Sequence, residues 1–89
     1  PLRRYYQTGE LNFHVDDTRS KIEELSRRFA DGRQSRLDGI SIEYPDWWFN
    51  VRPSNTEPVL RLNLEARTAD RLDEAKESVM RLLGRPEAG

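Results

Sequence analysis

The chain has 89 residues, a length that suits one domain, and its 15 Lys and Arg nearly balance its 16 Asp and Glu. The net charge of −1 argues against a general nucleic-acid binder, which would carry a strong basic excess. The chain has no cysteine and no long apolar run, which excludes a thiolate metal site and a membrane span and favours a cytoplasmic protein.

The first ten residues are polar and aromatic, and a chain that begins at Pro1 without Met is interpreted as a piece of a longer one. The first periodic segment follows them. Apolar and polar residues alternate there with a period of two, which predicts a strand with one buried face; the apolar positions are Leu11, Phe13 and Val15.

The next pattern is typical of a helix that begins at Asp16-Asp17-Thr18, where a side-chain oxygen can accept from free backbone N–H groups. Its apolar positions are Ile22, Leu25 and Phe29. Asp31-Gly32 is predicted to end it, with Gly32 in a left-handed cap. Acid–base pairs four residues apart are expected to support the helix surface, Glu23 with Arg27 and Glu24 with Arg28.

Residues 33–39 are predicted to be a loop. Three segments with period-two alternation follow and predict three strands, Ile40 to Tyr44, Trp47 to Val51 and Leu60 to Leu64. Thr68 can cap a last helix whose apolar face holds Leu72, Ala75, Val79, Leu82 and Leu83, and Gly84 with Pro86 ends it.

The predicted order is therefore β-α-β-β-β-α. Consecutive strands with short links favour antiparallel pairing. Each strand has one apolar face and each helix one apolar stripe. The fold class that buries all of them is an α+β two-layer sandwich, with a mostly antiparallel four-stranded sheet and two helices on one face.

The connection Arg52-Pro53-Ser54-Asn55-Thr56-Glu57-Pro58 is longer than a tight hairpin needs. Arg52 has a fork of donors that matches two phosphate oxygens. Ser54 and Thr56 add hydroxyl groups, and Asn55 adds an amide and tolerates left-handed backbone angles, so successive N–H groups can form a nest for an anion. The composition also suits a plain polar hairpin loop. The glycines and lysine of a nucleotide-binding P-loop are absent.

Other polar residues are interpreted as structural. His14, the only histidine, fits the solvent side of a strand. The carboxylates Asp16, Asp17, Asp70, Asp73 and Glu74 fit helix starts better than a metal site. Neither a catalytic residue nor a metal ligand is predicted in the chain.

Residues 52–58, with the strand Val59 to Ala66, closely resemble the phosphate-binding loop and following strand of the α-D-phosphohexomutase superfamily. Asp38-Gly39-Ile40 through Tyr44-Pro45-Asp46 resembles the strand before it. Arg3-Arg4-Tyr5 and Gly9 to Phe13 resemble the hinge and first strand of the last domain. Asn55 is typical of the bacterial phosphomannomutase/phosphoglucomutase branch, whereas Trp47 to Asn50 is more aromatic than the usual pattern.

The resemblance implies a TBP-like C-terminal domain at residues 11–84, after an interdomain hinge segment at 1–10 and before a tail at 85–89. It implies a four-domain parent enzyme, an isomerase that interconverts hexose 1-phosphate and hexose 6-phosphate of mannose or glucose. The parent's phosphoserine, its Mg²⁺ and its sugar-recognition residues belong to other domains. This domain would close over the cleft and grip the phosphate that is not transferred, through Arg52, Ser54, Asn55 and Thr56.

The expected partners are thus a hexose phosphate and the other domains of the same parent chain, with no nucleic acid and no membrane. The isolated domain is expected to be inactive. The alternative is a stand-alone αβ interaction module that binds protein or single-stranded RNA on its exposed sheet face, which the aromatic residues Tyr5, Tyr6 and Trp48 permit.

Overall fold

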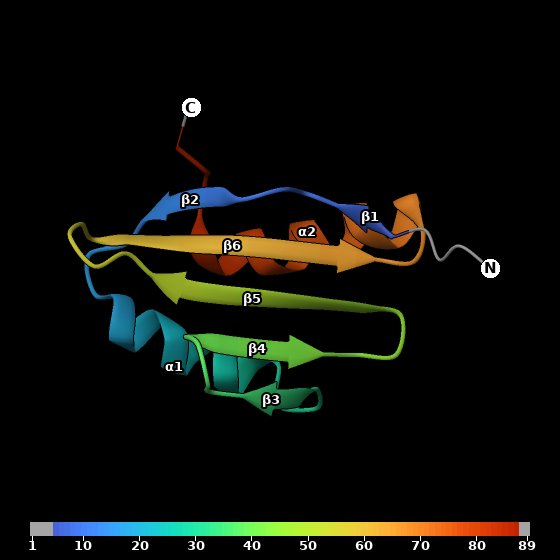
Figure 1. The fold of residues 1–89 in the computed structure, drawn as a ribbon, viewed down its shortest axis with the longest axis horizontal. Helices are drawn as coiled ribbons and strands as arrows, with labels where there is room; N and C mark the ends of the chain where they lie inside the picture. Colours follow the sequence, from blue (N-terminus) through green and yellow to red (C-terminus); the bar gives the residue numbers. More distant parts are fainter. Residues whose placement is uncertain (1–4, 88–89) are drawn as a thin grey trace.

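The predicted alternation forms an antiparallel sheet, and two helices cover one of its faces (Figure 1). The computed structural model describes residues 5–87. The Arg3-Arg4 part of the predicted hinge and the last two residues of the predicted tail lie outside this range. The elements in chain order are β1 (Tyr6–Gln7), β2 (Leu11–His14), α1 (Thr18–Arg28), β3 (Arg33–Ser35), β4 (Ile40–Glu43), β5 (Trp47–Pro53), β6 (Val59–Ala66) and α2 (Ala69–Leu83).

The sheet order is β1-β6-β5-β4-β3, and β2 pairs with β6 on the same side as β1. Every pairing is antiparallel. The long strands β5 and β6 form the centre, and Figure 1 shows their connection at one end of the sheet. The α+β fold class, with both helices on one face, is confirmed.

Register sorts the side chains onto two faces. Phe49 lies opposite Leu64, and Val51 opposite Leu62, and all four are fully buried against the helices. The residues between them point to the other face, which no helix covers. The central cross-strand pairs of this open face are Trp48 with Glu65, Asn50 with Asn63 and Arg52 with Arg61.

The core lies between the sheet and the helices. Helix α1 contributes Leu25, and α2 contributes Ala75, Val79 and Leu83. Both predicted N-terminal caps are confirmed: Asp17 Oδ1 accepts from Ser20 N at 3.0 Å, and Thr68 Oγ1 accepts from Arg71 N at 3.1 Å. The hydrogen bond from Ser20 N lowers the pKa of Asp17, because it stabilises the carboxylate.

The sequence predicted four strands, whereas the sheet of the described residues has six. Strand β3 lies within the predicted loop 33–39, and β1 lies within the predicted hinge segment. Strand β3 has no apolar alternation because its inward residue is Gln34. This amide accepts from Ser26 Oγ at 2.7 Å and donates to Ser26 O at 2.9 Å and Phe29 O at 3.1 Å, so it satisfies the end of α1 instead of filling the core.

Helix α1 ends at Arg28, and Gly32 has no left-handed backbone, so the predicted cap at Gly32 was wrong. Glycine is needed there for space. A Cβ on Gly32 would lie 2.5 Å from Ile42 Cγ2 and 3.0 Å from Tyr44 Cζ. At this position, directly before β3, only a hydrogen atom fits.

The ion pairs predicted on the surface of α1 also differ from those in the structure. Glu23 binds Arg36 with both carboxylate oxygens, at 2.9 and 3.2 Å, and Glu24 accepts from Lys21 Nζ at 2.7 Å. Arg27 and Arg28 act on these acids only through longer-range attraction. Tertiary structure brought Arg36 within reach of Glu23, and helical spacing alone could not predict that contact.

Candidate functional site

The connection between β5 and β6 is five residues long, Ser54 to Pro58, because β5 continues through Arg52 and Pro53. Two backbone bonds close it: Ser54 N donates to Val59 O at 2.9 Å, and Val59 N donates to Glu57 O at 2.7 Å. Asn55 has no positive φ, so the left-handed geometry expected for a nest is not present. The loop therefore relies on its side chains and on individual N–H groups.

The outer loop carries donors that the rest of the described chain does not use. Thr56 N donates to Ser54 Oγ at 3.4 Å, a long contact. Within residues 5–87, no acceptor is found for the backbone N–H of Asn55 or Glu57, or for the side chains of Asn55 and Thr56. Asn55, Thr56 and Glu57 are all exposed. An anion that docks here meets several available donors within three residues.

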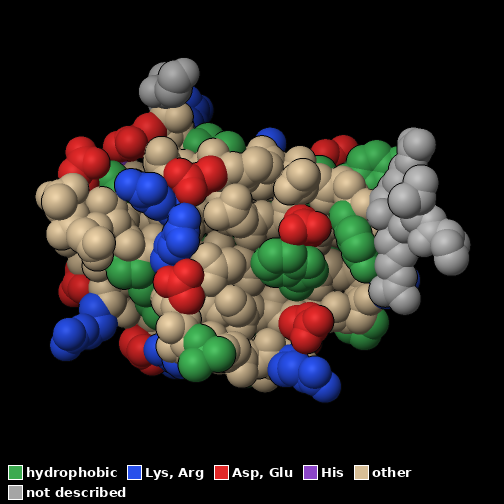
Figure 2. Space-filling model, in the orientation of Figure 1, with side chains coloured by type: hydrophobic (Ala, Val, Ile, Leu, Met, Phe, Trp, Pro, Cys, Tyr) green, Lys and Arg blue, Asp and Glu red, His purple; other side chains and the backbone are tan. Residues whose placement is uncertain are grey.

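Arg52 lies beside this loop, on the open face at the end of β5. Its cross-strand neighbour on β6 is Arg61, so two guanidinium groups stand side by side. Two acids accompany them. Glu10 lies 3.6 Å from Arg52 and 3.6 Å from Arg61, and Asp38 lies 3.6 Å from Arg52. Figure 2, which views the open face, shows basic side chains next to acidic ones toward the end where β5 and β6 join.

The turn at Asp38-Gly39 fixes one wall of this cluster. Gly39 has φ +65°, and its Cα approaches β5 so closely that an added Cβ would overlap Val51 O and lie 2.7 Å from Arg52 Cα. Asn50 Nδ2 donates to Asp38 O at 2.8 Å and to Ser41 Oγ at 3.0 Å. The turn is thereby held against the strand, with the Asp38 carboxylate next to Arg52.

We expect Gly39→Ala to lower the free energy of unfolding by more than about 2 kcal/mol, because a Cβ adds left-handed strain and a backbone clash. Gly9→Ala is the matched control. Gly9 has φ +72° but no atom within 4 Å of an added Cβ, so only the strain of about 1–2 kcal/mol remains. Urea unfolding measures both variants. Equal losses would contradict a close approach at Gly39.

The sequence named Arg52, Ser54, Asn55 and Thr56 as the site, and the structure places them together at one end of the sheet. It adds Arg61 and Glu10, which sequence analysis missed. Alternation in β6 already put Arg61 on the open face, but only the register shows that it faces Arg52. Glu10 belongs to a segment with no periodic pattern, so nothing in its surroundings marked it.

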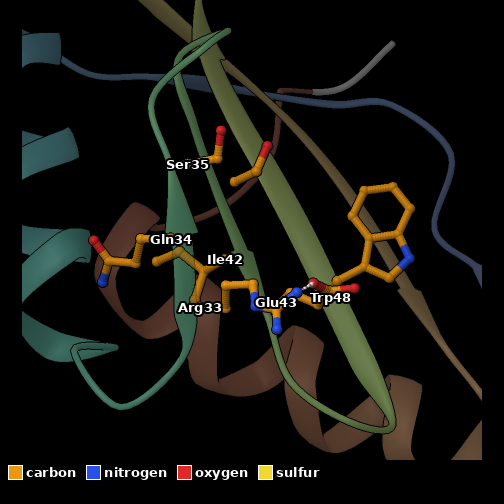
Figure 3. Close-up of a pocket in the computed structure, with 7 residues that line it drawn as sticks. Arg33, Gln34, Ser35, Ile42, Glu43 and Trp48 are labelled. Atoms are coloured by element: carbon orange, nitrogen blue, oxygen red, sulfur yellow. Dashed lines mark ion pairs between the residues drawn. The ribbon is translucent and has the colours of Figure 1, made fainter.

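The hollows of the surface differ in the chemistry of their lining. One of about 280 Å³ lies near the β3 edge of the sheet (Figure 3), where Arg33 and Glu43 pair at 3.8 Å beside Trp48. It contains no residue of the β5–β6 loop. A second hollow of about 270 Å³ adjoins Arg52 on the open face and is lined by Asn50, Asn63 and Trp48 among others.

The groups with shifted pKa values take part in structural contacts. Burial and a 2.6 Å hydrogen bond to Asp31 raise the pKa of Tyr44. The Arg36 guanidinium lowers the pKa of Glu23, and Glu23 in turn raises that of Arg36. Strongly shifted groups in a cleft often mark catalytic acids or bases. The first pair instead holds the connection between α1 and β3 to the residue after β4, and the second holds α1 to the loop after β3.

Residues 5–87 contain no group of three or more His, Asp or Glu side chains placed to hold a metal ion. His14 is exposed and contacts Asp16 at 3.0 Å. Neither described helix is long and apolar enough to cross a membrane.

The fold and this cluster define a small α+β domain that presents arginines, hydroxyl groups and free N–H groups at one end of an antiparallel sheet. Such a domain can hold an anion. Comparisons with known proteins agree in both fold and sequence. The family model described as phosphoglucomutase/phosphomannomutase, C-terminal domain, matches residues 10–82.

The phosphomannomutase of Methanocaldococcus jannaschii is 44% identical over 85 residues, which are 96% of this chain and 19% of that protein. The phosphomannomutase of Escherichia coli is 43% identical over 79 residues, covering 85% of this chain and 17% of the relative. A solved phosphoglucomutase/phosphomannomutase family protein from Burkholderia thailandensis aligns with a TM-score of 0.70 and 31% identity, over 90% of this chain and 17% of that one.

The chain belongs to the phosphoglucomutase/phosphomannomutase family and corresponds to its C-terminal domain. It spans less than a fifth of the length of the relatives that it matches.

Proposed function

We propose that this domain binds the phosphate of a hexose phosphate that is not being transferred, within an enzyme that interconverts hexose 1-phosphate and hexose 6-phosphate. The observation that carries the proposal is the position of Arg52. Arg52 lies on the open sheet face near the end of β5, just before the loop that carries the unused donors of Asn55 and Thr56. Ser54 supplies a further hydroxyl group in the same loop.

A phosphate group suits these donors better than a carboxylate does. A phosphate monoester is close to a dianion at neutral pH and offers three oxygens. Arg52 can bind two of them with its fork, and the loop can bind the third. Arg61 adds a second positive charge directly across the strand pair. The hollow of about 270 Å³ beside Arg52 leaves room for the rest of the ligand.

Phosphate recognition also answers a requirement of the proposed reaction. A mutase has to hold its sugar in two orientations, and a phosphate is present in both. Binding energy from this non-reacting group can position the sugar for transfer at a distant centre. The loop is exposed and lies at the end of the domain, so a movement of the whole domain can close the site and reopen it.

The bond-making residues are proposed to lie in other domains of the parent chain. This domain supplies positioning, and no nucleophile or general base is assigned to it. We expect it to be inactive alone and to work against the remaining domains, with Mg²⁺ held elsewhere. The sugar preference, mannose or glucose, belongs to those domains as well.

Loss of the loop hydroxyl groups is expected to slow the full-length enzyme. Ser54→Ala and Thr56→Ala should each lower kcat/KM by about tenfold or more, because hydrogen bonds to charged groups contribute about 1.5–3 kcal/mol. A coupled assay for hexose 6-phosphate formation measures this. Ser78→Ala is the control, since Ser78 lies on α2 and its hydroxyl group donates to Glu74 O at 3.1 Å. If the loop variants matched the Ser78 variant, the assignment of the loop to substrate would be wrong.

A further inference from the structure

The Arg52–Arg61 pair contains a feature that phosphate binding alone does not explain. Like charges directly opposite each other on neighbouring strands destabilise a sheet. The structure relieves this repulsion with Glu10, which reaches both guanidinium groups. Its Oε1 lies 3.6 Å from Arg52 Nη2, and its Oε2 lies 3.6 Å from Arg61 Nη1.

Glu10 therefore lies where a phosphate bound to both arginines would place its oxygens. We propose that the Glu10 carboxylate is an internal competitor of the substrate phosphate, and that it leaves Arg52 and Arg61 when a phosphate ester binds. The inference rests on the proposed function and concerns how that same site is regulated. It gives the site a built-in means of ligand release.

The contacts of Glu10 are suited to displacement. At 3.6 Å they are longer than charge-assisted hydrogen bonds, which measure about 2.7–2.9 Å. Among the described residues, Glu10 makes no side-chain hydrogen bond, and 38% of its side chain is exposed. An ion pair of this kind stabilises a fold only slightly. The carboxylate thus offsets the charge of the arginines without being fixed in place.

The charges around Glu10 and its backbone also favour replacement of its carboxylate by a phosphate. Arg52 and Arg61 carry two positive charges, and Glu10 and Asp38 carry two negative ones, so the cluster is locally balanced. A phosphate dianion added to this balanced cluster would leave it with two excess negative charges, and departure of one carboxylate would reduce that excess to one. Glu10 follows Gly9, which has φ +72° and open space around it, so the segment can turn outward there.

An unpartnered buried donor on Arg61 also favours a rearrangement of that side chain. Its Nε is buried and has no hydrogen-bond partner among the described residues, and neither has Oδ1 of Asn12, its cross-strand neighbour. A buried donor without a partner is costly. Release of Glu10 frees Arg61 to turn and find an acceptor, which offsets part of the cost of breaking the ion pair.

The test is a titration of the 89-residue chain with glucose 6-phosphate at pH 8 and low salt, followed by amide chemical shifts. In the wild type, ligand binding should move the amides of residues 8–11 together with those of the loop 52–57. Glu10→Gln keeps the shape of the side chain and removes the competing charge. We expect it to tighten binding about two- to fivefold, the range that exposed ion pairs support, and to reduce the shifts at 8–11.

Glu43→Gln is the matched control, because Glu43 pairs with Arg33 at the far edge of the same open face, at 3.8 Å. It should leave affinity unchanged. Weaker or equal binding by the Glu10 variant would overturn the proposal and make Glu10 a positioning residue or a bystander. Tighter binding with unchanged shifts at 8–11 would also overturn it, because the charge would then act only through space. If neither protein showed shifts at 52–57, the phosphate site itself would be wrong, and this inference would fall with it.

Discussion

Arg52→Ala is expected to abolish measurable binding of a hexose phosphate by this chain. A single anion site supplies about 4 kcal/mol, which corresponds to a dissociation constant on the order of millimolar. Loss of charge-assisted hydrogen bonds to the phosphate removes about 1.5–3 kcal/mol of that. The dissociation constant should then rise by about tenfold to a hundredfold, beyond the range of a practical titration.

Arg52→Lys separates charge from geometry. Lysine keeps the positive charge but not the planar fork, so we expect a smaller loss than with alanine. Arg33→Ala is the control for net charge, since Arg33 lies on the edge strand β3, away from Arg52, and pairs with Glu43. Titration followed by amide shifts measures all three. Equal affinities of the wild type and the Arg52→Ala variant would remove Arg52 from the site.

Phe49→Ala is expected to bring the domain close to unfolding. Phe49 is 0% exposed and lies at the centre of the aromatic cluster, with ring centroids 5.2 Å from Phe29 and 5.5 Å from Trp47. Truncation of a buried Phe to Ala costs about 3–5 kcal/mol. A domain of 89 residues has a total stability of about 4–13 kcal/mol, so this one change consumes a large part of it.

Leu37→Ala is the matched control, because Leu37 is also apolar but is 97% exposed. Its free energy of unfolding should change by less than about 0.5 kcal/mol. Urea unfolding of both variants, followed by far-ultraviolet circular dichroism, makes the comparison. Similar losses for the two variants would contradict the placement of Phe49 in the core.

The central part of the fold could be predicted because its signals are local. The alternation of Leu60, Leu62 and Leu64 fixes which side of β6 is buried, and Asp17 and Thr68 mark the helix starts through their own side chains. Strand β3 could not be predicted in this way. It is a short edge strand, and its inward residue, Gln34, is polar because it binds the end of α1.

The candidate site also contains residues that local sequence could predict and residues that it could not. Residues of one loop were predicted together because they are neighbours in sequence. Arg61 and Glu10 reach Arg52 only through the pairing of three strands, and a one-residue change of register would have placed them elsewhere. Gly32 is a position where the local signal was misleading. A glycine after a helix predicts a left-handed cap, but here glycine is required because a larger residue would clash with Ile42 and Tyr44.

The central claim is that the loop and Arg52 hold a phosphate. It is tested most directly by titrating the wild-type chain with glucose 6-phosphate and asking which amides move first. We predict that the first and largest shifts belong to residues 52–57. Shifts confined to the basic surface of α1, at Lys21, Arg27 and Arg28, would contradict the account.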